Sequence, residues 1–212
     1  MECAKTLKLK SSHSKPYLTD ANKITRMKHA LAFLQPSSNE TIFDSMNSYV
    51  HVDEKWFYLT TVKKCFYAYD DEELPKRQLK SKRFITKVMF LAAVARPRYD
   101  PHKKGFFDGK IGIWPFVETV IAKRNSPNRP KGTPLIVQVT ADVYRGMIIE
   151  KVIPAIKAKV PRQDQTKIIY LQQDNASPHN SVTTQMLLQA GVSGIEATNQ
   201  PPNSPDFNVC IG

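Results

Sequence analysis

Two aspartates in the sequence lie next to apolar segments, and their type and setting suit metal-dependent chemistry. Asp53 lies within Val52–Trp56, and Asp174 follows the apolar segment 167–172. A carboxylate at the end of an apolar strand is costly to bury without a balancing partner. Mg²⁺ is commonly held by one or two carboxylates, with water and phosphate oxygens completing its shell. Two such aspartates from separate strands therefore predict a divalent metal site, and the alternative for each is an aspartate that caps a turn.

The elements around these aspartates are expected to be mostly short strands. Residues 49–59 are β-branched and aromatic at both ends, and residues 64–69 form a second expected strand. Residues 87–95 are nearly all apolar, which predicts a third strand buried on both faces. Together they indicate an antiparallel meander. The Pro- and Lys-rich region 99–134 predicts an elaborated loop or short strands, and further strands are expected at 167–172 and 195–197.

Three segments have helical character. Residues 19–34 would start at Thr19 or Asp20 and stop before Pro36, with one apolar face formed by Ile24, Met27, Ala30, Leu31 and Leu34. Residues 141–159 repeat apolar side chains at 148, 152 and 156, with a kink at Pro154, and residues 180–190 end at Gly191. This order predicts a mixed α/β fold and agrees with a ribonuclease-H-like mixed sheet flanked by helices, although other mixed folds share the pattern.

The composition fits one domain with a basic surface. The chain has 212 residues, of which 41% are hydrophobic, and a formal net charge of +12. A positive surplus of this size favours a polyanionic partner, most often nucleic acid, and the alternative is a soluble basic protein without one. The three cysteines are far apart, and the N-terminus lacks the apolar stretch of a secretory signal. We therefore expect a nuclear or cytoplasmic protein with reduced thiols, neither secreted nor membrane-bound.

Five segments, in order along the chain, resemble mariner-type DNA transposases of the plant- and oomycete-like branch. The first acidic motif resembles His51-Val52-Asp53-Glu54-Lys55-Trp56-Phe57, and the second resembles Gln173-Asp174-Asn175-Ala176-Ser177-Pro178-His179. The lead into the third motif is similar to Gln200-Pro201-Pro202-Asn203-Ser204-Pro205-Asp206-Phe207-Asn208-Val209. Residues 82–91 and 15–23 are similar to the strand between the motifs and to the linker before the catalytic domain.

The resemblance implies a ribonuclease-H-like catalytic domain with three metal-binding carboxylates. Asp53 and Asp174 would be catalytic and would bind the metal, two Mg²⁺ (or Mn²⁺) ions in an intact site. The chemistry would be cleavage of a DNA strand and its transfer to a target, as in transposition and integration. Asn175 and His179 would orient the carboxylates or contact phosphate. The alternative is that Asn175 fixes a turn and His179 caps a helix, and Glu54 is expected to be a neighbour because successive strand residues face opposite sides.

The sequence departs from the family at the third acid. Counting along the motif places this acid at Ile211, which cannot coordinate a metal, and we expect the final helix of the domain to be missing. Asp206 is close in sequence, but it belongs to the turn. The paired helix-turn-helix modules of the family are also expected to be missing before Lys15. We therefore expect weakened metal binding and little or no transposition activity.

Basic residues remain available for DNA. The candidates for contact with a phosphate backbone are Lys76, Arg77, Lys80, Lys82, Arg83, Lys103 and Lys104. Trp114 is either a base-stacking platform or a core residue. We divide the chain into a basic linker and helix at 1–40 and a C-terminally truncated catalytic domain at 41–212. The leading hypothesis is a degenerate transposase-derived domain that binds double-stranded DNA, with a homodimer implied by the resemblance. The alternatives are a non-catalytic DNA-binding derivative and, less favoured, a general ribonuclease-H-like nuclease.

Overall fold

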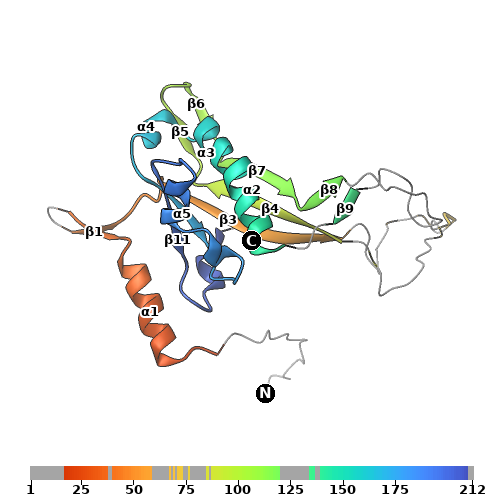
Figure 1. The fold of residues 1–212 in the computed structure, drawn as a ribbon, viewed down its shortest axis with the longest axis horizontal. Coiled ribbons are helices and arrows are strands. Elements are labelled where there is room, and N and C mark those ends of the chain that lie inside the picture. The colour runs from red at the N-terminus through yellow and green to blue at the C-terminus, as the bar shows by residue number, and fades with distance from the viewer. Residues whose placement is uncertain are drawn as a thin grey trace, which may run out of the picture.

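A five-stranded mixed sheet forms the centre of the molecule (Figure 1). The computed structural model describes residues 17–37, 40–58, 87–119, 134–136 and 139–209, together with residues 67, 69, 71–73, 76 and 85. The sheet contains β3 (Tyr49–Tyr58), β4 (Lys87–Ala95), β7 (Lys110–Pro115), β10 (Ile169–Gln173) and β11 (Ile195–Asn199) in the order β11-β10-β3-β4-β7. Strands β3, β4 and β7 are antiparallel neighbours, whereas β10 lies parallel to both β3 and β11. This mixed α/β arrangement confirms the ribonuclease-H-like layout.

The antiparallel half of the sheet agrees only in part with the expected meander, because its three successive strands are β3, β4 and β7. β3 pairs directly with β4, and Asp53 lies opposite Ala92 in this pairing. The expected strand 64–69 lies almost entirely outside the described residues. β4 buries Leu91 and Ala93 completely, but the residues that alternate with them on its other face are only half-buried. The prediction of burial on both faces was therefore wrong for β4.

A continuous helical segment packs on one face of the sheet near β7. It consists of α2 (Ala141–Met147), a π-helical turn at Ile148–Val152 and α3 (Ile153–Lys159). Ile148, Val152 and Ile156 are buried, as their spacing predicts. The π-helical turn lies directly before Pro154, which has no backbone N–H to donate, so the expected irregularity at this proline is present.

The third expected helix is shorter than its sequence pattern predicts. α5 (Thr184–Gln189) starts four residues late, because Thr183 caps its N-terminus and accepts a hydrogen bond from the Met186 backbone N–H. The preceding residues His179–Ser181 form a 3-10 turn. The helix is followed by Gly191, whose φ of 76° suits a left-handed stop.

The N-terminal helix differs most from expectation. α1 (Asp20–Leu31) is capped by Thr19 as predicted, but it ends before Leu34, which belongs to the short hairpin β1 (Leu34–Pro36) and β2 (Thr41–Phe43). The expected apolar face points outward, with Ile24, Met27 and Leu31 all more than half exposed. The residues of α1 that are half-buried include Arg26 and His29, since these contact the C-terminal turn.

Short strands and turns complete the described chain. Within the region 99–134, predicted to hold a loop or short strands, β6 (Gly105–Phe107) pairs with β5 (Arg98–Asp100), and β8 (Val117–Thr119) pairs with β9 (Pro134–Ile136). A short helix α4 (Arg162–Gln165) precedes β10, and a 3-10 turn at Pro205–Phe207 follows β11. Among the helices that the structure describes, none has the length and apolar character to span a bilayer.

Candidate functional site

The two motif aspartates lie in neighbouring strands of the sheet, but only Asp174 lies at a strand end, because β3 continues for five residues beyond Asp53. Asp53 is the fifth residue of β3, and Asp174 directly follows β10. Gln172 lies opposite His51 in the parallel pairing of these strands, and two further residues in the same register bring Asp174 beside Asp53. The sheet order therefore brings together two carboxylates that are separated by more than half of the chain.

Asp53 is the more enclosed of the two aspartates. Burial raises the pKa of its carboxyl group above the ordinary range. A hydrogen bond from the Glu54 backbone lowers this pKa in part, and the negative charges of Glu54 and Asp174 raise it further. The same three acidic side chains raise the pKa of Tyr144, after the effect of burial. The site therefore concentrates negative charge in a partly buried place, which favours binding of a cation.

His179 lies between two of the acidic side chains. Its Nε2 atom is 2.8 Å from Glu54 Oε1, and its Nδ1 atom contacts Asp174 Oδ1. The ring is almost fully buried, and burial alone lowers its pKa, but the hydrogen bonds to Asp174 and Glu54 raise the pKa to about 9. At neutral pH the imidazolium therefore donates to both carboxylates.

Asp174 is held in one orientation by two donors. His179 and the Ala176 backbone N–H, at 2.9 Å, both approach the Oδ1 atom. The hydrogen bond from His179 lowers the pKa of Asp174, so this carboxylate stays charged at neutral pH. Oδ2 makes no hydrogen bond to the described part of the chain, and Asp174 is partly exposed. One oxygen is thus fixed by the protein, and the other faces outward.

Tyr144 and Gln173 support His179 from the core. The Tyr144 ring stacks on the imidazole, with 4.2 Å between ring centres and 26° between planes, and its hydroxyl donates to Gln173 Oε1 at 3.1 Å. The Gln173 amide donates in turn to the carbonyl oxygens of His179 at 2.9 Å and Val182 at 3.1 Å, and to Asn199 Oδ1 at 2.8 Å. Gln173 therefore ties the segment that carries His179 to the edge of the sheet.

Sequence analysis missed the roles of Glu54, Gln173 and Tyr144. Glu54 was expected only as a neighbour of Asp53, but its carboxylate contacts His179. Gln173 is a polar residue at the end of an apolar strand, which is a usable signal, since a fully buried amide requires partners. Tyr144 lies on α2 and gives no signal of this kind, because only the packing of α2 on the sheet brings it to His179.

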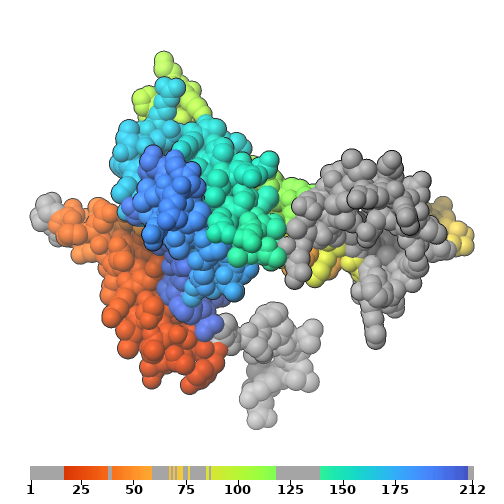
Figure 2. All heavy atoms as spheres, in the orientation of Figure 1, coloured from red at the N-terminus to blue at the C-terminus, as the bar shows by residue number. Residues whose placement is uncertain are grey.

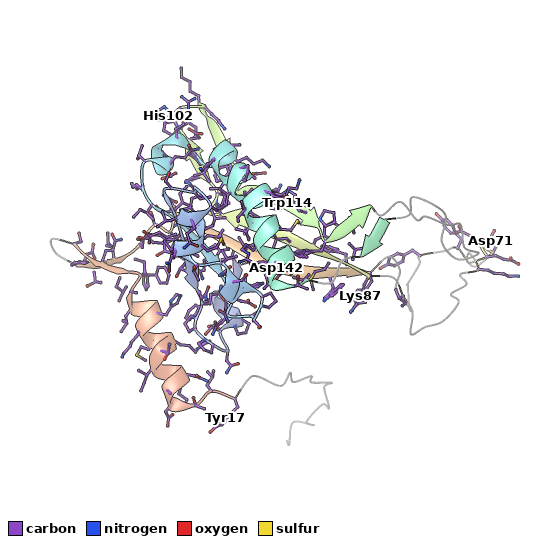
Figure 3. All side chains as sticks on the ribbon, in the orientation of Figure 1. Tyr17, Asp71, Lys87, His102, Trp114 and Asp142 are labelled. Carbon is purple, nitrogen blue, oxygen red and sulfur yellow. The ribbon has the colours of Figure 1, made fainter. Side chains whose placement is uncertain are left out.

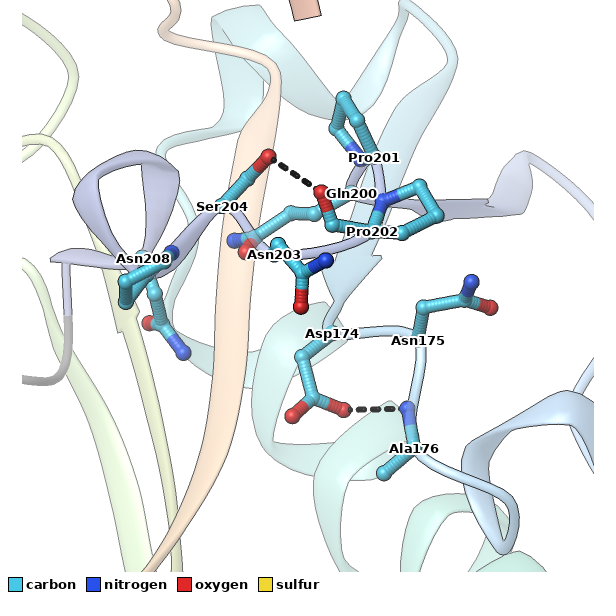
Figure 4. A pocket seen from close by; sticks show the side chains of 10 residues that line it. Asp174, Asn175, Ala176, Gln200, Pro201, Pro202, Asn203, Ser204 and Asn208 are labelled. Atoms are coloured by element: carbon cyan, nitrogen blue, oxygen red, sulfur yellow. Dashed lines mark hydrogen bonds between the residues drawn. The ribbon is translucent and has the colours of Figure 1, made fainter. Parts of the chain in front are cut away.

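A pocket of about 370 Å³ opens beside Asp174 (Figure 4). One wall is formed by Asp174, Asn175 and Ala176, and the facing wall is formed by the Pro-rich segment Gln200, Pro201, Pro202, Asn203, Ser204, Pro205 and Asn208. Asn175 is exposed on the first wall. The pocket is therefore an open space next to one of the two carboxylates, lined by both polar side chains and prolines.

The third acidic position does not add a ligand to the described site. Asp206, the substitute considered from the sequence, is paired with Arg26 on α1 at 2.7 Å. Ile211 lies outside the described residues. Among the residues that the structure places, no cluster of three or more His, Cys, Asp or Glu side chains is arranged to hold a metal ion. Two carboxylates, Asp53 and Asp174, remain, and this donor set fits one Mg²⁺ better than two.

Two of the predicted DNA-binding residues are placed by the structure at a distance from the carboxylates. Lys103 and Lys104 lie in the exposed turn between β5 and β6, next to His102 at one extremity of the molecule (Figure 3). Lys76 is exposed, and the remaining four candidates, Arg77, Lys80, Lys82 and Arg83, lie outside the described residues. Trp114 is half-buried and packs against the core, with its ring beside Gly112, which favours the core interpretation.

The fold is ribonuclease-H-like, and comparison with solved structures shows which proteins share it. The chain is similar to the Mos1 strand transfer complex (TM-score 0.57, 18% identity) and to the Mos1 mariner paired end complex with Mn (TM-score 0.56, 18% identity). It is also similar to a pre-cleavage Mos1 transpososome (TM-score 0.54, 16% identity). Each similarity covers 97% of this chain.

These similarities establish the fold of a mariner-like transposase domain. The chain spans about half the length of the Mos1 chains, 49% and 50% in these structures. No protein-family model matches the sequence, and no curated protein matches it.

Proposed function

We propose that this chain is a transposase-derived domain that binds double-stranded DNA and retains a reduced metal site formed by Asp53 and Asp174. The observation that supports this most strongly is the convergence of the two motif aspartates, Asp53 in the middle of β3 and Asp174 directly after β10. Their surroundings add support, because His179 joins Glu54 and Asp174 in one hydrogen-bonded cluster. The similarity to Mos1 complexes, whose names include Mg and Mn, supports a divalent cation as the ligand.

Each side chain has a distinct task in this proposal. Asp53 and Asp174 hold the cation, and His179 fixes Asp174 by occupying its Oδ1 atom. Glu54 keeps His179 protonated, and Tyr144 keeps the imidazole plane in place. When bound, the cation supplies the Lewis acidity that polarises a phosphate oxygen. The protein thus presents one oriented carboxylate and one enclosed carboxylate to a phosphodiester.

We expect this site to be degenerate as a catalyst. Transfer of a DNA strand with two metal ions requires ligands for both ions, and Ile211 stands at the third acidic position of the resemblance. An aliphatic side chain contributes no ligand. Metal binding should therefore survive in weakened form, and cleavage should be slow or absent.

The test is an incubation of the purified chain with labelled duplex DNA and Mg²⁺ or Mn²⁺. The control is Asp53→Asn combined with Asp174→Asn, which keeps the side-chain volumes and removes both charges. We expect little or no difference in cleavage between the two proteins. Robust metal-dependent cleavage that disappears in the control would show an active enzyme and overturn the proposed degeneracy.

A second candidate is a DNA-binding protein without any metal function, and the charge of +12 together with Ile211 favours it. The two candidates differ in the response of DNA binding to Mg²⁺. A metal at the carboxylates removes negative charge next to the DNA and should tighten binding relative to the same ionic strength of a monovalent salt. Binding that responds only to ionic strength would favour the metal-free candidate.

Two further parts of the proposal concern the cellular location of the protein and its oligomeric state. A nuclear location follows from DNA as the partner, and imaging of a tagged chain tests it. Self-association as a homodimer is proposed from the resemblance, and analytical ultracentrifugation tests it. The exposed apolar residues of α1, including Ile24 and Met27, are compatible with such contact.

A further inference from the structure

The N-terminal helix holds the C-terminal turn through contacts that the proposed metal chemistry does not use. Arg26 of α1 donates two hydrogen bonds to the Asp206 carboxylate, at 2.9 and 2.7 Å, and a third to the Asn203 carbonyl oxygen at 2.8 Å. Its guanidinium also lies 5.2 Å from the centre of the Phe207 ring. One side chain therefore contacts three residues of the turn, and Figure 2 shows the red atoms of α1 beside the dark blue atoms of the C-terminal segment.

A row of rings continues this contact into the sheet. The His29 ring lies 5.2 Å from Phe207 and 5.2 Å from Phe33. Phe33 lies 5.3 Å from Tyr49 at the start of β3, and Tyr49 stacks on Tyr170 of β10 at 5.0 Å. Because β3 contains Asp53 and β10 leads directly into Asp174, the row connects the turn with both strands of the site.

The turn held by Arg26 forms one wall of the pocket that faces Asp174. Asn203, Ser204 and Pro205 line this pocket opposite Asp174. On the other side of the turn, the Phe207 carbonyl oxygen accepts hydrogen bonds from the Gln200 amide at 3.0 Å and the Gln172 amide at 3.4 Å. The turn is thus fixed by α1 on one side and by the sheet on the other, so release of Arg26 should shift the pocket wall.

We propose that Arg26 is a positioning residue of the candidate site: by holding Asp206, it sets the distance across the pocket between the turn 203–207 and Asp174, and so controls binding of a DNA strand there. The inference rests on the proposed function for its ligand. It gives α1 a task in the site, although α1 contributes neither carboxylate.

The net charge of the chain and the positioning role of Arg26 make opposite predictions for the DNA affinity of Asp206→Asn. This change removes one negative charge and raises the net charge of the chain by one, which alone should tighten DNA binding. The change also removes one partner of a two-pronged ion pair, which should release the turn and weaken binding. Asp20→Asn is the matched control, because it also removes one negative charge. Asp20 lies on α1, the helix that carries Arg26, and its ion pair is with the exposed Lys23.

The experiment measures the affinity of the full chain for a fluorescein-labelled DNA duplex at fixed low salt in the presence of Mg²⁺. We expect Asp206→Asn to bind several-fold more weakly than wild type and Asp20→Asn to bind as tightly or more tightly. The reversed pair Arg26→Asp with Asp206→Arg should return affinity toward the wild-type value. Binding by Asp206→Asn that equals or exceeds that of Asp20→Asn would overturn the proposal. If Asp206→Asn does not fold, Arg26→Lys is compared with wild type instead, because it keeps the charge and loses the fork geometry. Weaker DNA binding by Arg26→Lys supports positioning, and equal binding overturns it.

A second measurement separates this inference from the proposed function. Backbone amide NMR signals of Asp174, Asn175 and Ala176, which Arg26 does not contact, report the geometry across the pocket. We expect Arg26→Lys to shift these signals along with those of residues 203–207, and Lys23→Ala to leave them unchanged. Shifts confined to 203–207 would show a local packing role and refute positioning. If the wild-type chain binds no DNA, the proposed function fails, and this measurement still decides the role of Arg26.

Discussion

His179 shows how a single side chain can organise a cluster of like charges. It donates to Glu54 and contacts Asp174, so two carboxylates that repel each other share one cation of the protein. Gln173 and Tyr144 fix the segment and the ring that make this possible. The carboxylate geometry is therefore set by residues that need not touch the metal themselves.

We expect His179→Gln to weaken Mn²⁺ binding about tenfold, within the range typical for residues that orient metal ligands. The reason is that Asp174 loses the imidazolium that holds its Oδ1 atom. Electron paramagnetic resonance of free Mn²⁺ measures the affinity directly. The comparison protein is His102→Gln, which alters an exposed histidine in the distant β5–β6 turn. Equal affinity of the two variants would contradict an orienting role.

Protonation of His179 should also make stability depend on pH. The pKa is raised from 6.5 to about 9 in the folded protein. A histidine whose pKa is raised by folding stabilises the fold fully at pH values below its unfolded pKa of 6.5. This contribution is lost as the pH rises through the folded pKa of about 9. The free energy of unfolding, measured with urea in the presence of a chelator, should therefore fall between these pH values more steeply for wild type than for His179→Gln. Parallel pH profiles would show that His179 is neutral in the folded state.

At the scale of elements, the sequence predicts the strands of the sheet better than it predicts the packing of the N-terminal helix α1. The strands that contain Asp53 and lead to Asp174 were both predicted, and Ile148, Val152 and Ile156 are buried as their period requires. The parallel pairing of β3 with β10 was not predicted, because it joins segments far apart in the chain. The inward face of α1 was not predictable from hydrophobic periodicity. Its contacts are an ion pair with a residue 180 positions away and a tilted contact between the rings of His29 and Phe207, and neither leaves a local pattern.

This difference between the two faces of α1 has a measurable consequence for stability. We expect Ile24→Ser combined with Met27→Ser to change the free energy of unfolding by at most about 0.5 kcal/mol per site, as for other exposed positions. Phe33→Ala should cost about 1–2 kcal/mol, since its half-buried ring packs between His29 and Tyr49 and a fully buried Phe costs more. Denaturant unfolding measures both. A larger loss from the Ile24 and Met27 changes would mean that the apolar face is the packed one.

At the scale of the whole molecule, the positive charge and the acidic cluster are separate features. The net charge of +12 coexists with a site where Asp53, Glu54 and Asp174 gather. The basic residues of the β5–β6 turn lie away from this site (Figure 3). DNA that reaches the carboxylates would therefore extend over a wide part of the surface, with many weak phosphate contacts.

Such contacts should make DNA affinity fall steeply with salt. For about six neutralised phosphates, we expect a loss of about a thousandfold between about 50 and 200 mM salt. Lys103→Ala combined with Lys104→Ala should lower the slope of log affinity against log salt by about two, one for each phosphate contact. Fluorescence anisotropy provides the series. An unchanged slope would show that these two lysines are only solvated.

The central claim, a divalent metal site formed by Asp53 and Asp174 in a ribonuclease-H-like domain, is tested most directly by Mn²⁺ titration of the purified chain. Isothermal titration calorimetry should show one bound Mn²⁺ in wild type, and binding should disappear when Asp53→Asn and Asp174→Asn are combined. Asp108→Asn, which alters an exposed aspartate paired with Lys110, serves as the control and should bind Mn²⁺ like wild type. Absence of Mn²⁺ binding by the wild-type chain, or binding that survives in the double variant, would contradict the claim.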